Sequence, residues 1–547
     1  MDVKEDFEKT ISWRIAGAAG QGVVNVGLIL AKTCLKEGFH VFANSENPSL
    51  IRGGHNYLTV RISNREVKSH EKFIDILVPL NQESVEKHVK SIKKGGCVIF
   101  DDKKIKISDS EKRDDVTFFS VPLEEFAKKC GGTILENMVA MGVTVGIMDL
   151  SFESLSETIA KIFSKKGENV VKNNIDAAKL GYDYAKENFS DSERFKLNKS
   201  GEMSNNRVLI SGNQSIAGGA IKAGCKFMSA YPMTPATSIM ETMASQERNY
   251  NIVMKQTEDE IAAINMAIGA SFCGARAMTA TSGGGFALMV EGFGLAAMTE
   301  TPLVVVISQR PGPATGMATR SGQGDLKFAL NAAPDDFPHI VLAPGDIEDC
   351  FYRTIEAFQI AEKYQTPVII LIDKFLSLSY KSAHFETSGI IVKRESMLSE
   401  DEIPDNYKRY RITSNGISPR TIPGQKKGMF TASSYEHNEE GHEDEDGNNR
   451  IRMAEKRFRK FKELSKEIKP PELIGPSDAD ITLLCWGSTK GVVEEAVRIL
   501  EKEGIKVNYM HYVFISPFPE EKTKNVINNG ISRFIYLLTE NIVVKKS

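Results

Sequence analysis

Residues 10–180 alternate short apolar runs with amphipathic segments. One segment follows a glycine-rich turn at residues 17–22 and places Val24, Leu28, Ala31 and Leu35 on one face of a helix. Strands that alternate with helices in this way predict an α/β sheet. The strand candidates are Ser12–Ile15, Val41–Asn44, Tyr57–Ile62, Ile74–Val78 and Cys97–Phe100.

A second alternating pattern covers residues 207–385. Four of its runs are apolar or nearly so: VLIS at 208–211, VVVIS at 304–308, IVLA at 340–343 and VIILI at 368–372. Strands that are covered on both faces have this composition, so we expect a parallel sheet with helices on each side. The strand candidates are Arg207–Ser211, Lys226–Ala230, Ile252–Lys255, Ala275–Ala280, Leu303–Ser308, His339–Leu342 and Val368–Ile372.

The pattern divides the chain into domains. Residues 1–190 form the first α/β domain, a polar linker follows at 191–206, and residues 207–385 form the second domain. Residues 386–475 are a long polar insert, with an acidic stretch at 436–446 and then a basic helix-like run at 451–469. Residues 476–547 resume the α/β pattern, with strand candidates at 480–486, 506–510 and 531–538.

The composition of the chain mainly excludes classes of partner, location and metal site. The 547 residues carry 69 Lys+Arg against 72 Asp+Glu, a net charge of −3, which gives no electrostatic reason to expect a nucleic acid or a membrane surface as partner. No apolar run approaches the length of a membrane span, and the charged start MDVKEDFEK is unlike a signal peptide. The seven cysteines are scattered without a CxxC pair, so we expect a reducing, cytoplasmic setting and no metal site on this chain.

Two glycine clusters lie in the first domain. The order G-x-x-G-x-G at Gly17–Gly22 differs from the dinucleotide fingerprint G-x-G-x-x-G, so we favour a tight turn over a bound dinucleotide. Arg52-Gly53-Gly54-His55 could present a charge and open backbone donors to an anion, but we favour a loop arginine that forms a surface ion pair. Neither cluster defines a site by itself.

The second domain places polar residues after four of its predicted strands. Thr234 stands in the stiff segment YPMTP, Ser282 opens a run of glycines, and Arg310 follows the strand Leu303–Ser308. Three acids, Glu258 to Glu260, begin an apolar helix, where they are typical of a helix N-terminus. One of them could be partly desolvated and could share a proton at neutral pH. Ligands bind at the carboxyl ends of parallel strands, so we expect these residues to lie near a ligand.

The acidic stretch holds His437 and His442 among carboxylates. These side chains could bind a metal ion, but the segment has almost no apolar anchor. We therefore expect a solvated, mobile loop.

These motifs, in this order, resemble the α subunit of a 2-oxoacid:ferredoxin oxidoreductase with the γ domain fused ahead of it. The resemblance covers nearly the whole chain and is closest to the 2-oxoglutarate type. It is carried by GAAGQG and Arg52-Gly53-Gly54 in the first domain, and elsewhere by Tyr231–Pro235, Gln256-Thr257-Glu258, Thr279–Gly285, Ser308–Gly316, Arg409–Gly424 and Trp486–Gly491. The family implies an α/β fold of several doubly wound domains: a γ-type Rossmann-like domain, a pyrimidine-binding domain and a transketolase-C-like domain.

The family also implies a function. A β subunit binds thiamine diphosphate with Mg²⁺ and carries a [4Fe-4S] cluster, and the two chains oxidise 2-oxoglutarate with coenzyme A to succinyl-CoA, passing electrons to ferredoxin. Glu258 matches the glutamate that contacts the pyrimidine ring of the cofactor, with Thr281 and Ser282 as further cofactor-binding residues. Thr234 and Arg310 match positions that hold the carboxylate of the 2-oxoacid. This chain alone is then inactive.

Some features depart from the family or leave alternatives open. Met233 and Ala236 stand where isoleucine and serine are usual, and the family usually continues beyond residue 547, so we expect a shortened last domain. Pyruvate or another 2-oxoacid is the alternative substrate. A non-catalytic nucleotide-binding relative is the alternative class, and an NAD-dependent dehydrogenase is disfavoured by the glycine order.

Overall fold

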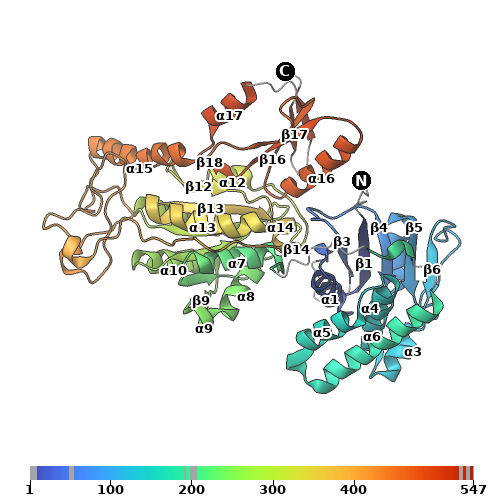
Figure 1. The fold of residues 1–547 in the computed structure, drawn as a ribbon. Helices are drawn as coiled ribbons and strands as arrows, with labels where there is room; N and C mark the ends of the chain where they lie inside the picture. The colour runs from blue at the N-terminus through green and yellow to red at the C-terminus, as the bar shows by residue number, and fades with distance from the viewer. Residues whose placement is uncertain are drawn as a thin grey trace. The chain divides into compact units, whose positions relative to one another are not determined.

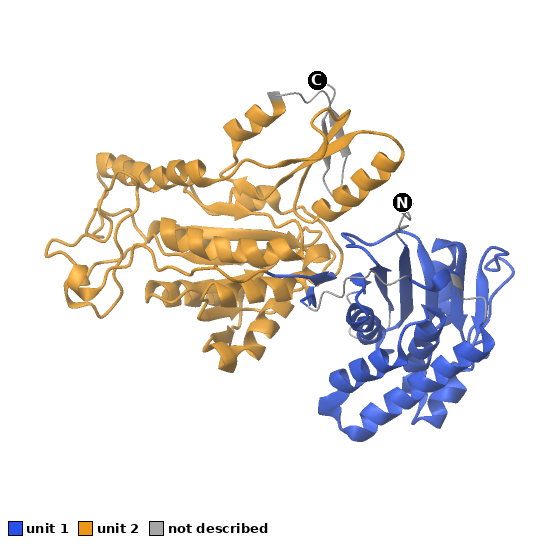
Figure 2. Cartoon of the chain, viewed as in Figure 1, with its two compact units in different colours: residues 1–210, 379–385 blue, residues 211–378, 386–547 orange. Residues whose placement is uncertain are grey.

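A computed structural model describes residues 9–48, 54–189, 193–197, 206–528, 534–537 and 542–545. The chain forms two compact units (Figure 2). Unit 1 consists of residues 1–210 and 379–385, and unit 2 of residues 211–378 and 386–547. Among the described residues, no helix is long and apolar enough to cross a membrane.

Unit 1 is built on an eight-stranded mixed sheet in the order β6-β5-β4-β1-β3-β2-β14-β7 (Figure 1). β1 pairs parallel with β4, while β3 pairs antiparallel with both β1 and β2. The α/β prediction for this region is therefore confirmed, with antiparallel pairs added. The strands are β1 (Thr10–Ala18), β2 (His40–Glu46), β3 (His55–Ser63), β4 (Ile74–Pro79), β5 (Ile92–Phe100), β6 (Thr117–Ser120), β7 (Val208–Ser211) and β14 (Tyr380–Ala383).

Helices pack on this sheet around a core in which Trp13 and Ile15 of β1 are fully buried. The indole Nε1 of Trp13 donates to Thr144 Oγ1 of α4 at 3.1 Å, which satisfies its buried N–H. Gly142 of α4 and Gly181 of α6 lie where the two helices pack, and a Cβ at either would overlap backbone of the other helix. The helices are α1 (Val23–Lys36), α2 (Gln82–His88), α3 (Leu123–Lys129), α4 (Glu136–Ile147), α5 (Phe152–Phe163) and α6 (Glu168–Asn188).

Two strands of unit 1 come from sequence that we expected to belong to the second domain. β7, the run VLIS, was predicted as a buried strand of the second sheet, and this prediction is wrong. It forms an edge of the first sheet beside β14, and Val208 keeps 48% of its surface exposed. β14 is held by side chains as well as backbone: Ser382 Oγ accepts from the N–H of Val41 at 2.9 Å. An apolar run alone does not specify which sheet a strand joins.

Unit 2 contains the predicted parallel sheet, in the order β18-β12-β13-β11-β10-β8-β9, with only the edge strand β18 antiparallel. Leu303, Val305 and Ile307 of β11 enter a core shared with α10 and α11. Val304 and Val306 are equally buried and point to the opposite face, onto which α13 packs. Helices therefore cover both faces, as expected. The strands are β8 (Phe227–Ala230), β9 (Val253–Gln256), β10 (Ala277–Thr281), β11 (Leu303–Gln309), β12 (Ile340–Leu342), β13 (Pro367–Asp373) and β18 (Phe514–Ser516).

Polar caps set where several of these helices begin. Ser211 and Gln214 form a capping box at the start of α7, and Asp346 accepts from the N–H of Asp349 at the start of α13. α7 and α13 pack against each other. The helices are α7 (Gly212–Lys222), α8 (Thr237–Ser245), α9 (Glu247–Tyr250), α10 (Glu260–Phe272), α11 (Gly283–Met298), α12 (Leu326–Leu330), α13 (Ile347–Tyr364) and α14 (Lys374–Leu378).

The polar stretch 386–475 is largely irregular and ends in the helix α15 (Gly447–Glu467), which Asp446 caps. The expectation of a mobile acidic loop is not met at His437, which is fully buried against the ring of Tyr410. Glu436 is paired with Arg450 and Arg457 of α15. Ion pairs and one tilted ring–ring contact thus replace the apolar anchor that the sequence lacks.

A five-stranded sheet in the order β15-β17-β16-β19-β20 completes unit 2. Leu484 and Trp486 of β16 enter the same core as α10 and α11, so this sheet shares its interior with the parallel sheet. The elements are β15 (Leu473–Ile474), β16 (Ile481–Trp486), α16 (Thr489–Lys502), β17 (Val507–Tyr512), α17 (Glu520–Asn528), β19 (Phe534–Leu537) and β20 (Ile542–Lys545).

Candidate functional site

Four neighbouring strands of unit 2 end at one edge of the parallel sheet. In spatial order they are β11, β10, β8 and β9, and they pair in parallel, so their carboxyl ends lie at the same edge. Arg310 follows β11, Ser282 follows β10, and Glu258 follows β9. Thr234 lies in the loop between β8 and α8. The structure therefore brings the four predicted segments side by side, at the edge where parallel sheets bind ligands.

Arg310 and Thr234 are in direct contact. Arg310 Nη1 donates to the backbone carbonyl of Thr234 at 2.6 Å, which ties the YPMTP loop to the end of β11. Arg310 is only 9% exposed, and burial lowers the pKa of its guanidinium, while the charge of Asp325 raises it. A buried guanidinium with donors to spare suits a planar anion such as a carboxylate.

The three acids after β9 have three different environments. Glu258 is exposed in this chain. Asp259 caps α10, with Oδ1 accepting from the N–H of Ala262 at 2.7 Å. Glu260 is 3% exposed, and its Oε1 is buried without a hydrogen-bond partner. The partly desolvated carboxyl group that the sequence predicts in this turn is thus Glu260, whereas the family motif points to Glu258.

Gly285 lies close to the side chains of both Glu260 and Thr281. A Cβ at this position would lie 2.6 Å from Glu260 Oε1 and would overlap Thr281 Oγ1. Thr281 and Ser282 are both fully buried, and Ser282 Oγ has no hydrogen-bond partner. The glycine run after β10 is therefore required for close approach, which its sequence predicts.

A further acid, Asp325, lies at this edge, and the sequence reasoning missed it. Its N–H donates to Gln309 Oε1 at 3.1 Å, and its carboxylate lies against Gly283, where a Cβ would overlap both oxygens. Asp325 Oδ2 and Gln309 Nε2 are buried without partners. In the sequence, an aspartate before a short helix looks like an ordinary cap, so no local signal distinguishes it.

The glycine turn of unit 1 is tightly packed. Gly20 and Gly22 have φ values of 94° and 71°, which favour glycine, and Gln21 Oε1 accepts from the N–H of Ala18 at 2.6 Å. Asn137 Nδ2 donates to the carbonyl of Gln21 at 2.8 Å. Arg52 and Gly53 of the second glycine cluster lie outside the described residues.

The acidic, histidine and cysteine side chains of the described residues form neither a metal cluster nor a disulfide. No group of three or more His, Cys, Asp or Glu among the described residues is placed to hold a metal ion. All seven cysteines are free, and most are buried, with burial raising the pKa of thiols such as Cys225 to about 12.

Comparison with known proteins extends these observations. Residues 12–184 match the family model "Pyruvate ferredoxin/flavodoxin oxidoreductase", and 218–456 match "Pyruvate flavodoxin/ferredoxin oxidoreductase, thiamine diP-bdg". Residues 479–537 match "Pyruvate:ferredoxin oxidoreductase core domain II".

Named relatives agree with these matches. A 2-oxoacid:ferredoxin oxidoreductase subunit alpha from Sulfolobus sp is 33% identical over 98% of this chain and 92% of its own length. A 2-oxoglutarate synthase subunit KorA from Methanocaldococcus jannaschii is 36% identical over 58% of this chain and 85% of its own length. A solved 2-oxoglutarate:ferredoxin oxidoreductase from Magnetococcus marinus, with 2-oxoglutarate, coenzyme A and succinyl-CoA bound, superposes with a TM-score of 0.90 at 33% identity, covering 96% of this chain and 92% of that one. The chain therefore belongs to the 2-oxoacid:ferredoxin oxidoreductase family, as a member of its α subunits.

Proposed function

We propose that this chain, together with a β subunit, oxidises 2-oxoglutarate with coenzyme A to succinyl-CoA and passes the electrons to ferredoxin. The observation that carries the proposal is the set of buried polar atoms without partners at adjacent strand ends: Glu260 Oε1, Ser282 Oγ and Gln309 Nε2. Buried polar groups are nearly always hydrogen-bonded, so a cluster of exceptions indicates groups that a ligand satisfies. The KorA relatives and the Magnetococcus structure support 2-oxoglutarate as the substrate.

Thiamine diphosphate fits this edge of the sheet. Thr281 and Ser282 offer hydroxyl groups, and the close approach at Gly285 leaves Glu260 Oε1 available to a ring nitrogen of the pyrimidine. When bound, the cofactor supplies the nucleophilic carbon that attacks the 2-oxoacid. The chain contributes a carboxyl group that holds and shares a proton at the pyrimidine nitrogen. We assign this role to Glu260, with Glu258 as the alternative that the family motif predicts.

Arg310 and Thr234 are the residues that we assign to the substrate. The guanidinium is fixed by its bond to the Thr234 carbonyl, so it meets the 1-carboxylate of the 2-oxoacid in a set orientation. The Thr234 hydroxyl adds a neutral donor. Both groups sit on rigid elements, the end of β11 and the proline-stiffened loop after β8.

A partner subunit is supported by the apolar helices beside the site. α10 and α11 are apolar almost all round, a composition typical of buried helices, yet Ile261, Met266 and Leu288 are 51%, 38% and 51% exposed. We propose that the β subunit covers this face, next to the cofactor. We place Mg²⁺ and the [4Fe-4S] cluster on that subunit, and the complex in the cytoplasm.

The test is to co-express the chain with a β subunit of the same family and to measure reduction of ferredoxin. We expect a brown, iron-containing complex that binds thiamine diphosphate and turns over 2-oxoglutarate with coenzyme A. Faster turnover of pyruvate would change the substrate but keep the reaction. A stable complex that binds no thiamine diphosphate and turns over no 2-oxoacid would support a non-catalytic relative instead.

A further inference from the structure

Asp325 lies between the two features of this edge that attract an anion. It immediately precedes α12, and its N–H is bonded to Gln309, the neighbour of Arg310 in the chain. Its carboxylate lies against Gly283, the first residue of α11. The backbone of Asp325 is therefore hydrogen-bonded to the end of β11, and its side chain lies close to the start of α11.

The charges around Asp325 oppose one another. Burial raises the pKa of its carboxyl group, and the charge of Arg310 lowers it. The positive end of the dipole of α11, a helix of 16 residues, lies at Gly283 and also favours a negative charge there. An ionised Asp325 thus offsets part of the positive potential that Arg310 and α11 present to an incoming anion.

We propose that Asp325 is a specificity-determining residue that sets how strongly this site discriminates between 2-oxoacids of different charge. This inference rests on the proposed function. A carboxylate beside Arg310 leaves enough positive potential for the single carboxylate of a monoanionic 2-oxoacid. It disfavours the second negative charge of a dianion such as 2-oxoglutarate, which then depends on further cations for its binding. Asp325 acts through the field at Arg310, and no contact with the substrate is assigned to it.

The experiment compares 2-oxoglutarate with pyruvate in the complex with the β subunit. For Asp325→Asn, the ratio of kcat/KM for 2-oxoglutarate to that for pyruvate should rise by about three- to tenfold, the size expected for one charge near a partly buried site. The change should come mainly from a lower KM for 2-oxoglutarate. A purely structural lesion would instead lower kcat for both acids and leave the ratio unchanged.

Three variants complete the test. Asp325→Glu keeps the charge and should keep the wild-type ratio, and Asp336→Asn makes the same chemical change at an exposed site in the following loop. Asp325→Ser is a smaller neutral variant in case the asparagine does not fold. An unchanged ratio in the neutral variants overturns the inference, as does failure of both to assemble when Asp325→Glu does.

Calorimetric Kd values for the same two acids separate this inference from the proposed function. If the wild-type complex binds both acids but turns over neither, the proposed function fails. The ratio of the two Kd values in Asp325→Asn and wild type then still decides the role of Asp325. Equal Kd ratios overturn it.

Discussion

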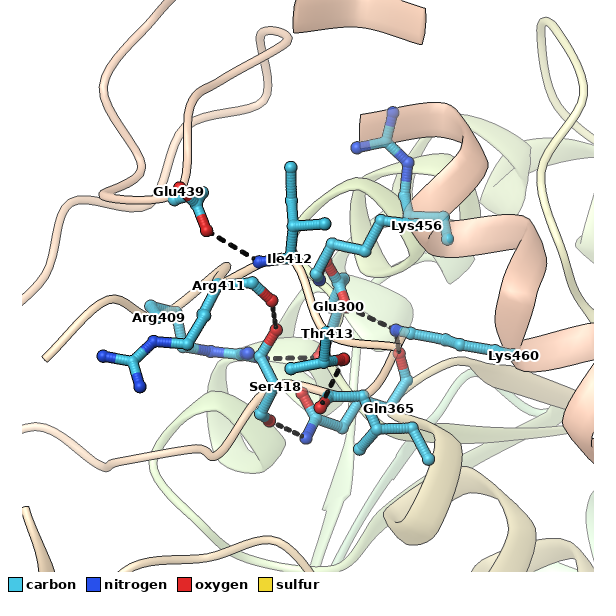
Figure 3. A network of polar contacts seen from close by, with 12 residues as sticks. Glu300, Gln365, Arg409, Arg411, Ile412, Thr413, Ser418, Glu439, Lys456 and Lys460 are labelled. Carbon is cyan, nitrogen blue, oxygen red and sulfur yellow. Dashed lines mark hydrogen bonds and ion pairs between the residues drawn. The ribbon is translucent and has the colours of Figure 1, made fainter. Parts of the chain in front are cut away.

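Two regions of unit 2 bury charged groups, and they differ in whether those groups have partners within the chain. Around α15, Glu300 is fully buried and meets Lys456 and Lys460, which are also buried (Figure 3). Lys456 Nζ lies 2.5 Å from Glu300 Oε1, and Lys460 Nζ also donates to the carbonyl of Gln365 at 3.1 Å. At the strand ends, Glu260 and Asp325 instead keep buried oxygens without any partner.

The difference separates a structural network from a site. In the α15 network, Glu300 is paired with Lys456 and Lys460 within the chain, so these ion pairs fasten a polar segment to the sheet domain. Leaving a buried polar atom unpaired costs about 1–3 kcal/mol. The unpaired groups at the strand ends carry this cost in the chain alone. We expect a ligand or a partner subunit to pair with them. Buried charge alone therefore does not indicate function, whereas several unpaired buried polar atoms at adjacent carboxyl ends of parallel strands favour a ligand site.

The largest expected effect is a loss of turnover on substitution of Glu260, one of the strand-end groups with an unpaired buried oxygen. In the complex with the β subunit, Glu260→Gln should keep assembly and lower turnover by about 10²–10⁴-fold, since the amide cannot share a proton. Glu258→Gln, two residues earlier in the same turn and exposed, is the matched control and should lower turnover far less. Ferredoxin reduction measures both.

The opposite order, with Glu258→Gln the damaging change, would return the role to the residue that the family motif indicates. Unchanged turnover in both variants would remove the carboxyl group of this turn from the mechanism.

The next effect concerns stability in the α15 network. Glu300→Gln leaves Lys456 and Lys460 buried without a counter-charge, so unit 2 should lose about 3–5 kcal/mol of unfolding free energy. Denaturant unfolding, followed by the fluorescence of Trp486 in a Trp13→Phe background, measures this loss because the chain has two tryptophans.

The control is the exposed pair Asp405–Lys427, whose side chains are 92% and 57% exposed. Asp405→Asn should change stability by about 0–1 kcal/mol. If the two substitutions have equal effects, the network does not hold α15 in place, and the contrast with the strand-end site is lost.

A smaller effect is a pH dependence from the same network. Burial lowers the pKa of Lys460 to about 7, although Glu300 raises it. An unfolded lysine titrates near about 10.4, so between these values the unfolded chain holds a proton that the folded chain has released. Stability contributed by Lys460 therefore rises with pH through this window.

Lys460→Gln lacks this titration. The difference in denaturation midpoint, wild type minus variant, should increase between about pH 7 and pH 10. Lys462→Gln, at an exposed position of the same helix, is the matched control. A difference that stays constant for Lys460→Gln would show that the buried lysine keeps its proton throughout this range.

The strand-end arrangement was largely predictable, and its detailed environment was not. Apolar runs and the turns between them indicate strands of one parallel sheet that share a carboxyl edge, so Thr234, Ser282 and Arg310 could be placed together. The choice between Glu258 and Glu260 depends on which side of the turn faces the core. That is a tertiary property, and three consecutive acids at a helix start hide it. β7 was assigned to the wrong sheet because its pairing with β14 joins residues far apart in the chain.

The smallest expected effect is a change in stability when the single hydroxyl group of Ser282 is removed. Ser282 Oγ is buried without a partner, so Ser282→Ala removes a desolvated polar atom and loses no protein hydrogen bond. The stability of the chain without ligand should change by about 0–1 kcal/mol, in the stabilising direction. Ser271 is also buried, but its hydroxyl donates to the carbonyl of Pro302, so Ser271→Ala should instead cost about 1 kcal/mol of stability.

Cofactor binding gives the second measurement on the same two variants. If Ser282 binds the cofactor, Ser282→Ala must also weaken thiamine diphosphate binding in the complex, while Ser271→Ala does not. A stabilised chain with undiminished cofactor affinity would show that an unpartnered buried hydroxyl at this edge is not evidence of a ligand.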